Sequence, residues 1–165
     1  MKTYKKLHES KEVANIHIKA KGGEVKQSVQ NGKILLEYSF PLIVYRTEKA
    51  HSSYKGMSVW GDGLYFGLNK ETVAEMTTNP HSEYHEEPDY DSVKEYVIPS
   101  IIKLKKIDLA NMDNRKFNSM PKGNELKNLI IKQGYDGVIL LTDDDLNYGG
   151  DQLILYTKKA INMVS

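Results

Sequence analysis

Short apolar segments separated by polar turns make up most of this chain, and they predict a mixture of strands and helices. The β-branched and aromatic run Leu42-Ile43-Val44-Tyr45 predicts a buried strand, which ends at Arg46. Residues 96–107 also have mostly strand character, broken at Pro99. Three further apolar runs predict strands: Leu64-Tyr65-Phe66, Val138-Ile139-Leu140-Leu141 and Leu153-Ile154-Leu155-Tyr156.

Helical spacing and stop signals predict helices between these strands. The segments concerned are Val13, Ile16 and Ala20 before Gly22-Gly23; Asn69, as a cap, to Met76; and Leu126, Leu129 and Ile130 between the cap Asn124 and Gly134. Residues 77–91 and 111–123 are polar and are predicted to be loops. This order of elements predicts an α+β domain built around a split sheet, with function carried on the loops.

Composition limits the classes of protein to consider. The 165 residues correspond to one domain, and Cys is absent, which fits a reducing compartment. Lys and Arg number 23 against 22 Asp and Glu, which gives no case for a general nucleic-acid binder. The apolar runs are too short to span a bilayer, and the basic start of the chain lacks the apolar stretch of a secretion signal. We therefore expect a soluble, cytoplasmic protein that does not act in a membrane.

Arginine is scarce in this chain, since only Arg46 and Arg115 interrupt an otherwise lysine-based set of cations. The planar guanidinium binds phosphate or carboxylate with paired donors, which lysine cannot copy. An arginine at the end of an apolar strand is therefore a candidate ligand-binding residue, and the alternative is a surface arginine at a strand end.

Several motifs occur in an informative order along the chain. They are Val44-Tyr45-Arg46-Thr47, then Gly61-Asp62-Gly63-Leu64-Tyr65-Phe66-Gly67 before a helix, then Gly134-Tyr135-Asp136-Gly137-Val138-Ile139, and finally Gly149-Gly150-Asp151-Gln152-Leu153-Ile154-Leu155-Tyr156. This set resembles the ADP-ribosyltransferase superfamily, and most closely its poly(ADP-ribose) polymerase and diphtheria-toxin branch. The resemblance covers residues 42–164. Residues 1–40 carry none of it and are expected to form an extension that packs on the core of a single domain, 1–165.

The resemblance implies an ADP-ribosyltransferase-like split sheet with short flanking helices, and NAD⁺ as co-substrate without a metal. Tyr65 would match the family tyrosine that stacks on nicotinamide, with a core tyrosine as the alternative. Arg46 would hold the ribose or diphosphate, and the backbone of Arg46 or Thr47 would hold the nicotinamide amide. Gly63 belongs to the implied NAD⁺-binding turn. Gln152 falls at the position of the catalytic glutamate.

Gln152 departs from the family pattern in a way that matters for chemistry. Loss of nicotinamide leaves a ribose of oxocarbenium character, which a glutamate stabilises by charge and by binding the 2′-hydroxyl. Gln152 can accept from that hydroxyl but brings no charge. The position two residues earlier is Gly150, where arginine-modifying members carry Glu or Gln, and this argues against an arginine acceptor. Asp151 is expected to point to the opposite face of the strand.

Glu75 adds a second, weaker resemblance. Residues 65–76 look like the strand and helix of the RES toxins, an NAD⁺-consuming group in which a glutamate on that helix is functional. The alternative for Glu75 is an exposed helical glutamate.

Three functions follow as hypotheses. The leading one is an NAD⁺-dependent mono-ADP-ribosyltransferase that modifies a macromolecule, in the first instance a protein, as a toxin, an effector or a phage-encoded host modifier; nucleic acid is left open as an acceptor. The second is a RES-like NAD⁺ glycohydrolase. The third is an inactive transferase fold that binds a partner through residues 77–91, where Tyr84 and Tyr90 are of the type enriched at interfaces.

Two possible ion sites fail on their details. His81, His85 and Glu86 lie in a loop without cysteine, where a solvated polar loop is the better interpretation than a metal site. Residues 143–154 begin like a calcium loop but have Tyr148 at the sixth position and Ile154 at the twelfth.

Overall fold

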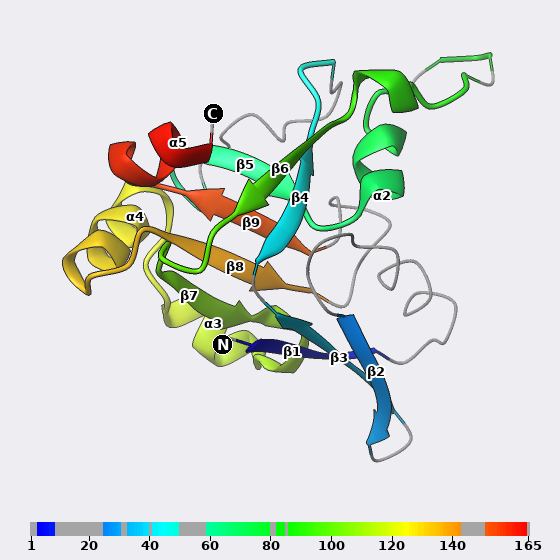
Figure 1. Ribbon diagram of the computed structural model, residues 1–165. Helices are drawn as coiled ribbons and strands as arrows, with labels where there is room; N and C mark the ends of the chain where they lie inside the picture. The colour runs from blue at the N-terminus through cyan, green and yellow to red at the C-terminus, as the bar shows by residue number, and fades with distance from the viewer. Residues whose placement is uncertain are drawn as a thin grey trace.

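A six-stranded mixed sheet forms the centre of the fold (Figure 1). The computed structural model describes residues 3–8, 25–30, 33–39, 41–49, 59–79, 82–84, 86–142 and 151–164. The strand order is β6-β4-β5-β9-β8-β7, and only β7 and β8 run parallel. The bounds are β4 Leu42–Arg46, β5 Leu64–Gly67, β6 Lys94–Ile98, β7 Leu104–Asp108, β8 Gly137–Leu141 and β9 Gln152–Leu155.

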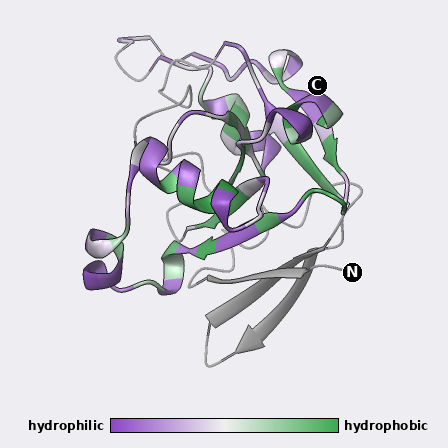
Figure 2. Ribbon diagram, turned by 90° about the vertical axis from the view of Figure 1, so that its left-hand side faces the viewer, coloured by the Kyte–Doolittle hydropathy of each residue, from purple (hydrophilic) through white to green (hydrophobic). Residues whose placement is uncertain are grey.

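Short helices flank this sheet, so the predicted α+β class is confirmed (Figure 1). They are α2 Lys70–Glu75, α3 Asn114–Ser119, α4 Gly123–Lys132 and α5 Lys158–Val164, with 3₁₀ turns η1 Tyr90–Ser92 and η2 Leu109–Asn111. Within the described residues no helix has the length and apolar character needed to cross a membrane. In Figure 2, α4 carries both hydrophobic and hydrophilic residues, as expected for a helix with one face on a core.

A second, antiparallel sheet is built from the start of the chain. It consists of β1 Thr3–His8, β2 Val25–Gln30 and β3 Lys33–Ser39 in the order β1-β3-β2, and β1 contacts η2. The helix predicted for residues 13–20 lies outside the described residues.

The six-stranded sheet is buried on both faces, which explains why its inner strands are continuously apolar. On β8, Val138 and Leu140 pack toward α4 with Leu126 and Ile130, in one apolar cluster. The residues between them, such as Ile139, pack on the other face in a cluster that includes Ala160 of α5. Successive side chains of a strand point to opposite faces, so one apolar run supplies both clusters.

Three details differ from the sequence-based expectations. Residues 111–123 are not all loop, because Asp113 accepts a hydrogen bond from the Lys116 N–H and caps α3. α4 begins at Gly123 and lacks a side-chain cap, since Asn124 instead accepts from the Asp62 N–H. Residues 96–107 do not form one broken strand but supply β6 and β7, which lie at opposite edges of the sheet.

The motif around Asp136 has a structural explanation. The Asp136 carboxylate accepts from the Lys103 N–H at 3.0 Å and from the Thr157 hydroxyl at 2.9 Å, so it ties the segment before β7 to the segment after β9. At Gly137 an added Cβ would lie 2.1 Å from the Ile154 carbonyl oxygen, so only glycine allows β8 to approach β9 here.

Candidate functional site

Arg46, Tyr65 and Gln152 come from distant parts of the chain but lie on three consecutive strands. Arg46 ends β4, Tyr65 is the second residue of β5, and Gln152 begins β9, and the sheet order places β4, β5 and β9 side by side. Gly67 is paired with Tyr45 on one side and with Gln152 on the other. Tyr45 and Gln152 therefore flank Gly67 on one face of the sheet, whereas Arg46, the next residue of β4, belongs by alternation to the opposite face.

The pairing between β4 and β5 is much shorter than that of their other neighbours. Along these two described strands only Tyr45 and Gly67 pair, whereas β5 pairs with β9 over four positions and β4 with β6 over five. Figure 1 shows β4 crossing β5 steeply. The sheet is therefore loosely joined beside Arg46.

The Arg46 side chain bridges this weak junction. Its Nη1 donates to the Tyr65 carbonyl oxygen at 3.0 Å, and its Nε donates to Glu48 Oε1 at the same distance. The Arg46 side chain is 17% exposed, whereas that of Glu48 is 72% exposed. A guanidinium has more N–H donors than these two contacts use, so Arg46 can still bind an anion from the solvent side.

Tyr65 is a core residue, which is the alternative reading of this position. It is 3% exposed, and its ring packs with Val138, Ile154 and the buried face of α4. Its hydroxyl donates to the Gly61 carbonyl oxygen at 2.6 Å. In this position the ring supports the turn before β5, and its face is covered by protein rather than offered to nicotinamide.

The burial of Tyr65 makes the stability of the fold depend on alkaline pH. Burial, with a smaller effect from the Asp62 charge, raises the pKa of Tyr65 from 10.0 to about 12. The phenol is neutral in both states below pH 10, and above it the unfolded state loses the proton first, so stability should fall between pH 10 and 12. We expect Tyr65→Phe to reduce this alkaline fall in the urea midpoint, while lowering stability at pH 7 by about 1 kcal/mol because the Gly61 carbonyl loses its partner.

The control for this prediction is Tyr135→Phe, which removes the hydroxyl of a partly buried tyrosine that packs against the same apolar cluster. An unchanged slope of urea midpoint against pH in Tyr65→Phe would contradict the assignment of the late titration to Tyr65.

The glycines of the Gly61-Asp62-Gly63 turn are explained by packing. Gly61 has φ +87°, and an added Cβ would lie 2.8 Å from the Gly123 carbonyl oxygen at the start of α4. At Gly63 an added Cβ would lie 2.7 Å from the Leu155 carbonyl oxygen. The structure therefore gives Gly63, which the resemblance assigns to NAD⁺ binding, a role in close packing against β9.

Gln152 is half-buried at the start of β9 and has a contact of its own. It lies on the same face of the sheet as Tyr65, because Tyr65 is paired with Ile154 and positions two apart share a face. Tyr65 and Gln152 are diagonal neighbours, about 7–8 Å apart. The position facing Gln152 on β5 is Gly67, which has no side chain, so no side chain of β5 stands directly against the carboxamide.

Asp151 fixes the start of β9. It is fully buried, and its Oδ1 accepts from the Thr142 N–H at 2.9 Å while its carbonyl oxygen accepts from the Leu68 N–H at 3.0 Å. These contacts tie β9 to the end of β8 and to the residue after β5. They hold Gln152 in register with Gly67.

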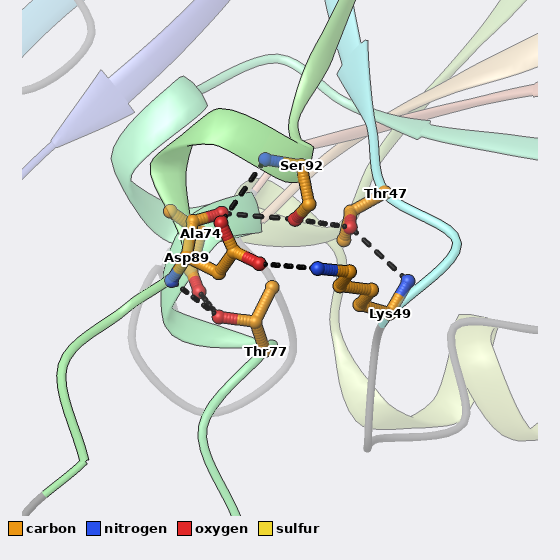
Figure 3. A network of polar contacts seen from close by, with 6 residues as sticks. All are labelled: Thr47, Lys49, Ala74, Thr77, Asp89 and Ser92. Carbon is orange, nitrogen blue, oxygen red and sulfur yellow. Dashed lines mark hydrogen bonds and ion pairs between the residues drawn. The ribbon is translucent and has the colours of Figure 1, made fainter.

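Thr47 and Glu75 have different surroundings from the three strand residues. Thr47 is 2% exposed, and its hydroxyl contacts the Ser92 hydroxyl at 2.9 Å and accepts from the Lys49 N–H (Figure 3). Glu75 is exposed at the end of α2. The pKa of Tyr90 is raised mainly by the burial of its phenol and to a smaller extent by the negative charge of Glu75. The described contacts therefore place Thr47 in a polar network and Glu75 on the outer surface.

Sequence reasoning missed Glu48, Asp89 and Ser92, which surround the end of β4. Glu48 could have been noticed as a carboxylate two residues after the only strand-end arginine. Asp89 belongs to the segment 77–91 assigned as loop, Ser92 follows that segment directly, and no local pattern connects either residue with Thr47.

Among the described residues, no group of three or more His, Cys, Asp or Glu side chains is arranged to hold a metal ion. Several motif positions fall outside the described residues, namely His81, His85, residues 143–147 and Gly150.

Comparison with known proteins found no protein-family model, no curated protein and no solved structure that matches this chain. Only the residues of this chain and their arrangement bear on its function.

Proposed function

We propose that this chain is an NAD⁺-dependent mono-ADP-ribosyltransferase with an ADP-ribosyltransferase-like sheet. The observation that supports it is the placement of Arg46, Tyr65 and Gln152 on consecutive strands, in the chain order of the motifs. In this proposal Arg46 binds the diphosphate or a ribose of NAD⁺ through its remaining N–H donors. Tyr65 acts through its backbone, as the carbonyl that orients Arg46.

The chemistry asked of the site is a substitution at the anomeric carbon of the nicotinamide ribose. The bond between that carbon and the nicotinamide nitrogen breaks, and its electron pair leaves with neutral nicotinamide. A nucleophilic atom of the acceptor forms the new bond to the same carbon and gives up its proton to solvent. In this proposal the Gln152 oxygen accepts from the ribose 2′-hydroxyl, so that the ribose is held in place as positive charge develops.

The test is an assay of nicotinamide release from NAD⁺, with and without a cell lysate. We expect release to depend on the lysate, and mass spectrometry of the lysate proteins to show a gain of ADP-ribose. Release of equal rate without lysate would instead identify the glycohydrolase alternative, with water as the acceptor. No release in either arm, from protein with an intact fold, would contradict both enzymatic functions.

One observation favours a binding protein as the second candidate. Tyr84 is 82% exposed and Tyr90 is 43% exposed, both within the segment predicted to dock a partner. Exposed tyrosines of this kind are enriched in interfaces. Absence of nicotinamide release together with absence of NAD⁺ binding would favour this function.

A further inference from the structure

A polar network surrounds the residue that follows Arg46 (Figure 3). Thr47 Oγ1 contacts Ser92 Oγ at 2.9 Å, and Ser92 Oγ also donates to the Asp89 carbonyl oxygen at 2.9 Å. Asp89 Oδ2 pairs with Lys49 Nζ at 2.8 Å. The end of β4 is thereby attached to η1, which is 45 positions away from Thr47 along the chain.

The hydrogen-bond directions in this network are determined by its donors. Ser92 has one hydroxyl proton, and if that proton goes to the Asp89 carbonyl, the Thr47 hydroxyl donates to Ser92 Oγ. Thr47 Oγ1 in turn accepts from the Lys49 N–H at 3.2 Å. Thr47 is 2% exposed, so each of these contacts satisfies a buried group.

The turn at Thr47 sets the relation between Arg46 and Glu48, because these two residues flank it. The Arg46 guanidinium contacts Glu48 on one side of this turn and the Tyr65 carbonyl on the other strand. A change in the turn would therefore move the guanidinium relative to both partners.

We propose that the Thr47 hydroxyl, held by Ser92, is a positioning group for the Arg46 guanidinium. The positioning of Arg46 by Thr47 is inferred from the hydrogen bonds above. The expected effect of this positioning on NAD⁺ binding rests on the proposed function. Thr47 itself need not touch the ligand, since its side chain is buried in the network.

The chain offers a matched control in Thr77. Its hydroxyl donates to the Ala74 carbonyl oxygen at 2.6 Å and accepts from the Asp89 N–H at 2.8 Å, so it also donates once and accepts once (Figure 3). Thr77 is 9% exposed and belongs to the same network, but it follows α2 in the chain, whereas Thr47 directly follows Arg46. Thr47→Val and Thr77→Val therefore remove equivalent hydroxyls, only one of which belongs to the residue next to Arg46 in the chain.

The first measurement does not need activity. The chain has only two arginines, and Arg115 is exposed, so the arginine Nε–H signals of ¹⁵N-labelled protein contain one site signal and one internal reference. We expect solvent exchange of the Arg46 Nε–H to become at least about threefold faster in Thr47→Val, because its contact with Glu48 loosens. Thr77→Val and Thr47→Ser, which keeps the hydroxyl, should retain the wild-type rate.

The second measurement is the KM for NAD⁺ in the nicotinamide assay. We expect Thr47→Val to raise KM about tenfold with a smaller change in kcat, with Thr47→Ser restoring it and Thr77→Val matching the wild type. Ser92→Ala removes the partner of the Thr47 hydroxyl and should raise KM in the same way. It therefore replaces Thr47→Val as the test if that variant does not fold.

The two measurements separate the two ideas. Equal Arg46 exchange in folded Thr47→Val and Thr77→Val would overturn the positioning role, whatever the activity. A wild-type protein that releases no nicotinamide would contradict the proposed function, while the exchange rates would still decide the role of Thr47.

Discussion

Arg46→Lys is expected to lower kcat/KM for NAD⁺ by about 100-fold, and Arg46→Ala by about 1,000-fold, which correspond to roughly 3 and 4 kcal/mol of transition-state stabilisation. The guanidinium bonds the Tyr65 carbonyl and Glu48 in different directions and still has donors for a ligand. A lysine ammonium is one point charge on a flexible stem, so it cannot hold these partners and a diphosphate in a fixed geometry. The measurement is the initial rate of nicotinamide release across NAD⁺ concentrations.

The matched control is Arg115→Lys, the same exchange at the only other arginine, which is exposed on α3. We expect it to leave kcat/KM unchanged, which would show that loss of a guanidinium elsewhere in the chain does not lower the activity. Circular dichroism and the urea midpoint should confirm that Arg46→Lys stays folded. Wild-type kinetics in a folded Arg46→Lys protein would remove Arg46 from the site.

The parts of the fold that follow from local chemistry could be predicted from the sequence. The β-branched run that ends at Arg46 forms β4, and Asn69 caps α2 by accepting from the Thr72 N–H as expected. The apolar run at residues 138–141 forms β8, which begins one residue earlier. The run at residues 153–156 forms β9, which begins and ends one residue earlier. These elements were predictable because each depends on residues close together in sequence.

The parts that depend on distant partners could not be predicted. Asn124 has the side chain of a helix cap, but its oxygen is used by the Asp62 N–H, 62 positions away. The apolar positions of residues 96–107 indicate strands without showing that β6 and β7 occupy opposite edges of the sheet. Leu129 has helical spacing with Leu126 but is 39% exposed, because packing and not periodicity alone decides the buried face.

The motif order along the chain indicated three candidate residues but not their surroundings in the fold. The motif order indicated Arg46, Tyr65 and Gln152, and the structure places them on adjacent strands. An aromatic residue after a glycine turn can serve a ligand or a core, and only the burial of Tyr65 and its bond to Gly61 separate these alternatives. The contribution of Ser92 to the end of β4 depends on a tertiary contact and has no sequence signal.

Gln152→Glu is expected to raise kcat for nicotinamide release by about 100-fold, roughly 3 kcal/mol, and Gln152→Ala to lower it by about tenfold. A carboxylate at the start of β9 would face the ribose as positive charge develops, whereas the present carboxamide offers only a hydrogen bond. Gln152 is half-buried, so a charge there is less screened than one on the open surface. Initial rates at saturating NAD⁺ measure the effect on kcat.

The gain should also depend on pH, because only the ionised carboxyl stabilises the developing charge. The ratio of Gln152→Glu to wild-type kcat should rise as pH increases through the titration of the new carboxyl and then level off. Gln133→Glu makes the same change at an exposed residue at the end of α4 and controls for net charge, so its kcat should equal that of the wild type. If Gln152→Glu gave the wild-type rate at every pH, the side chain at position 152 would not face the reacting ribose, and the reaction would need a different group to stabilise its positive charge.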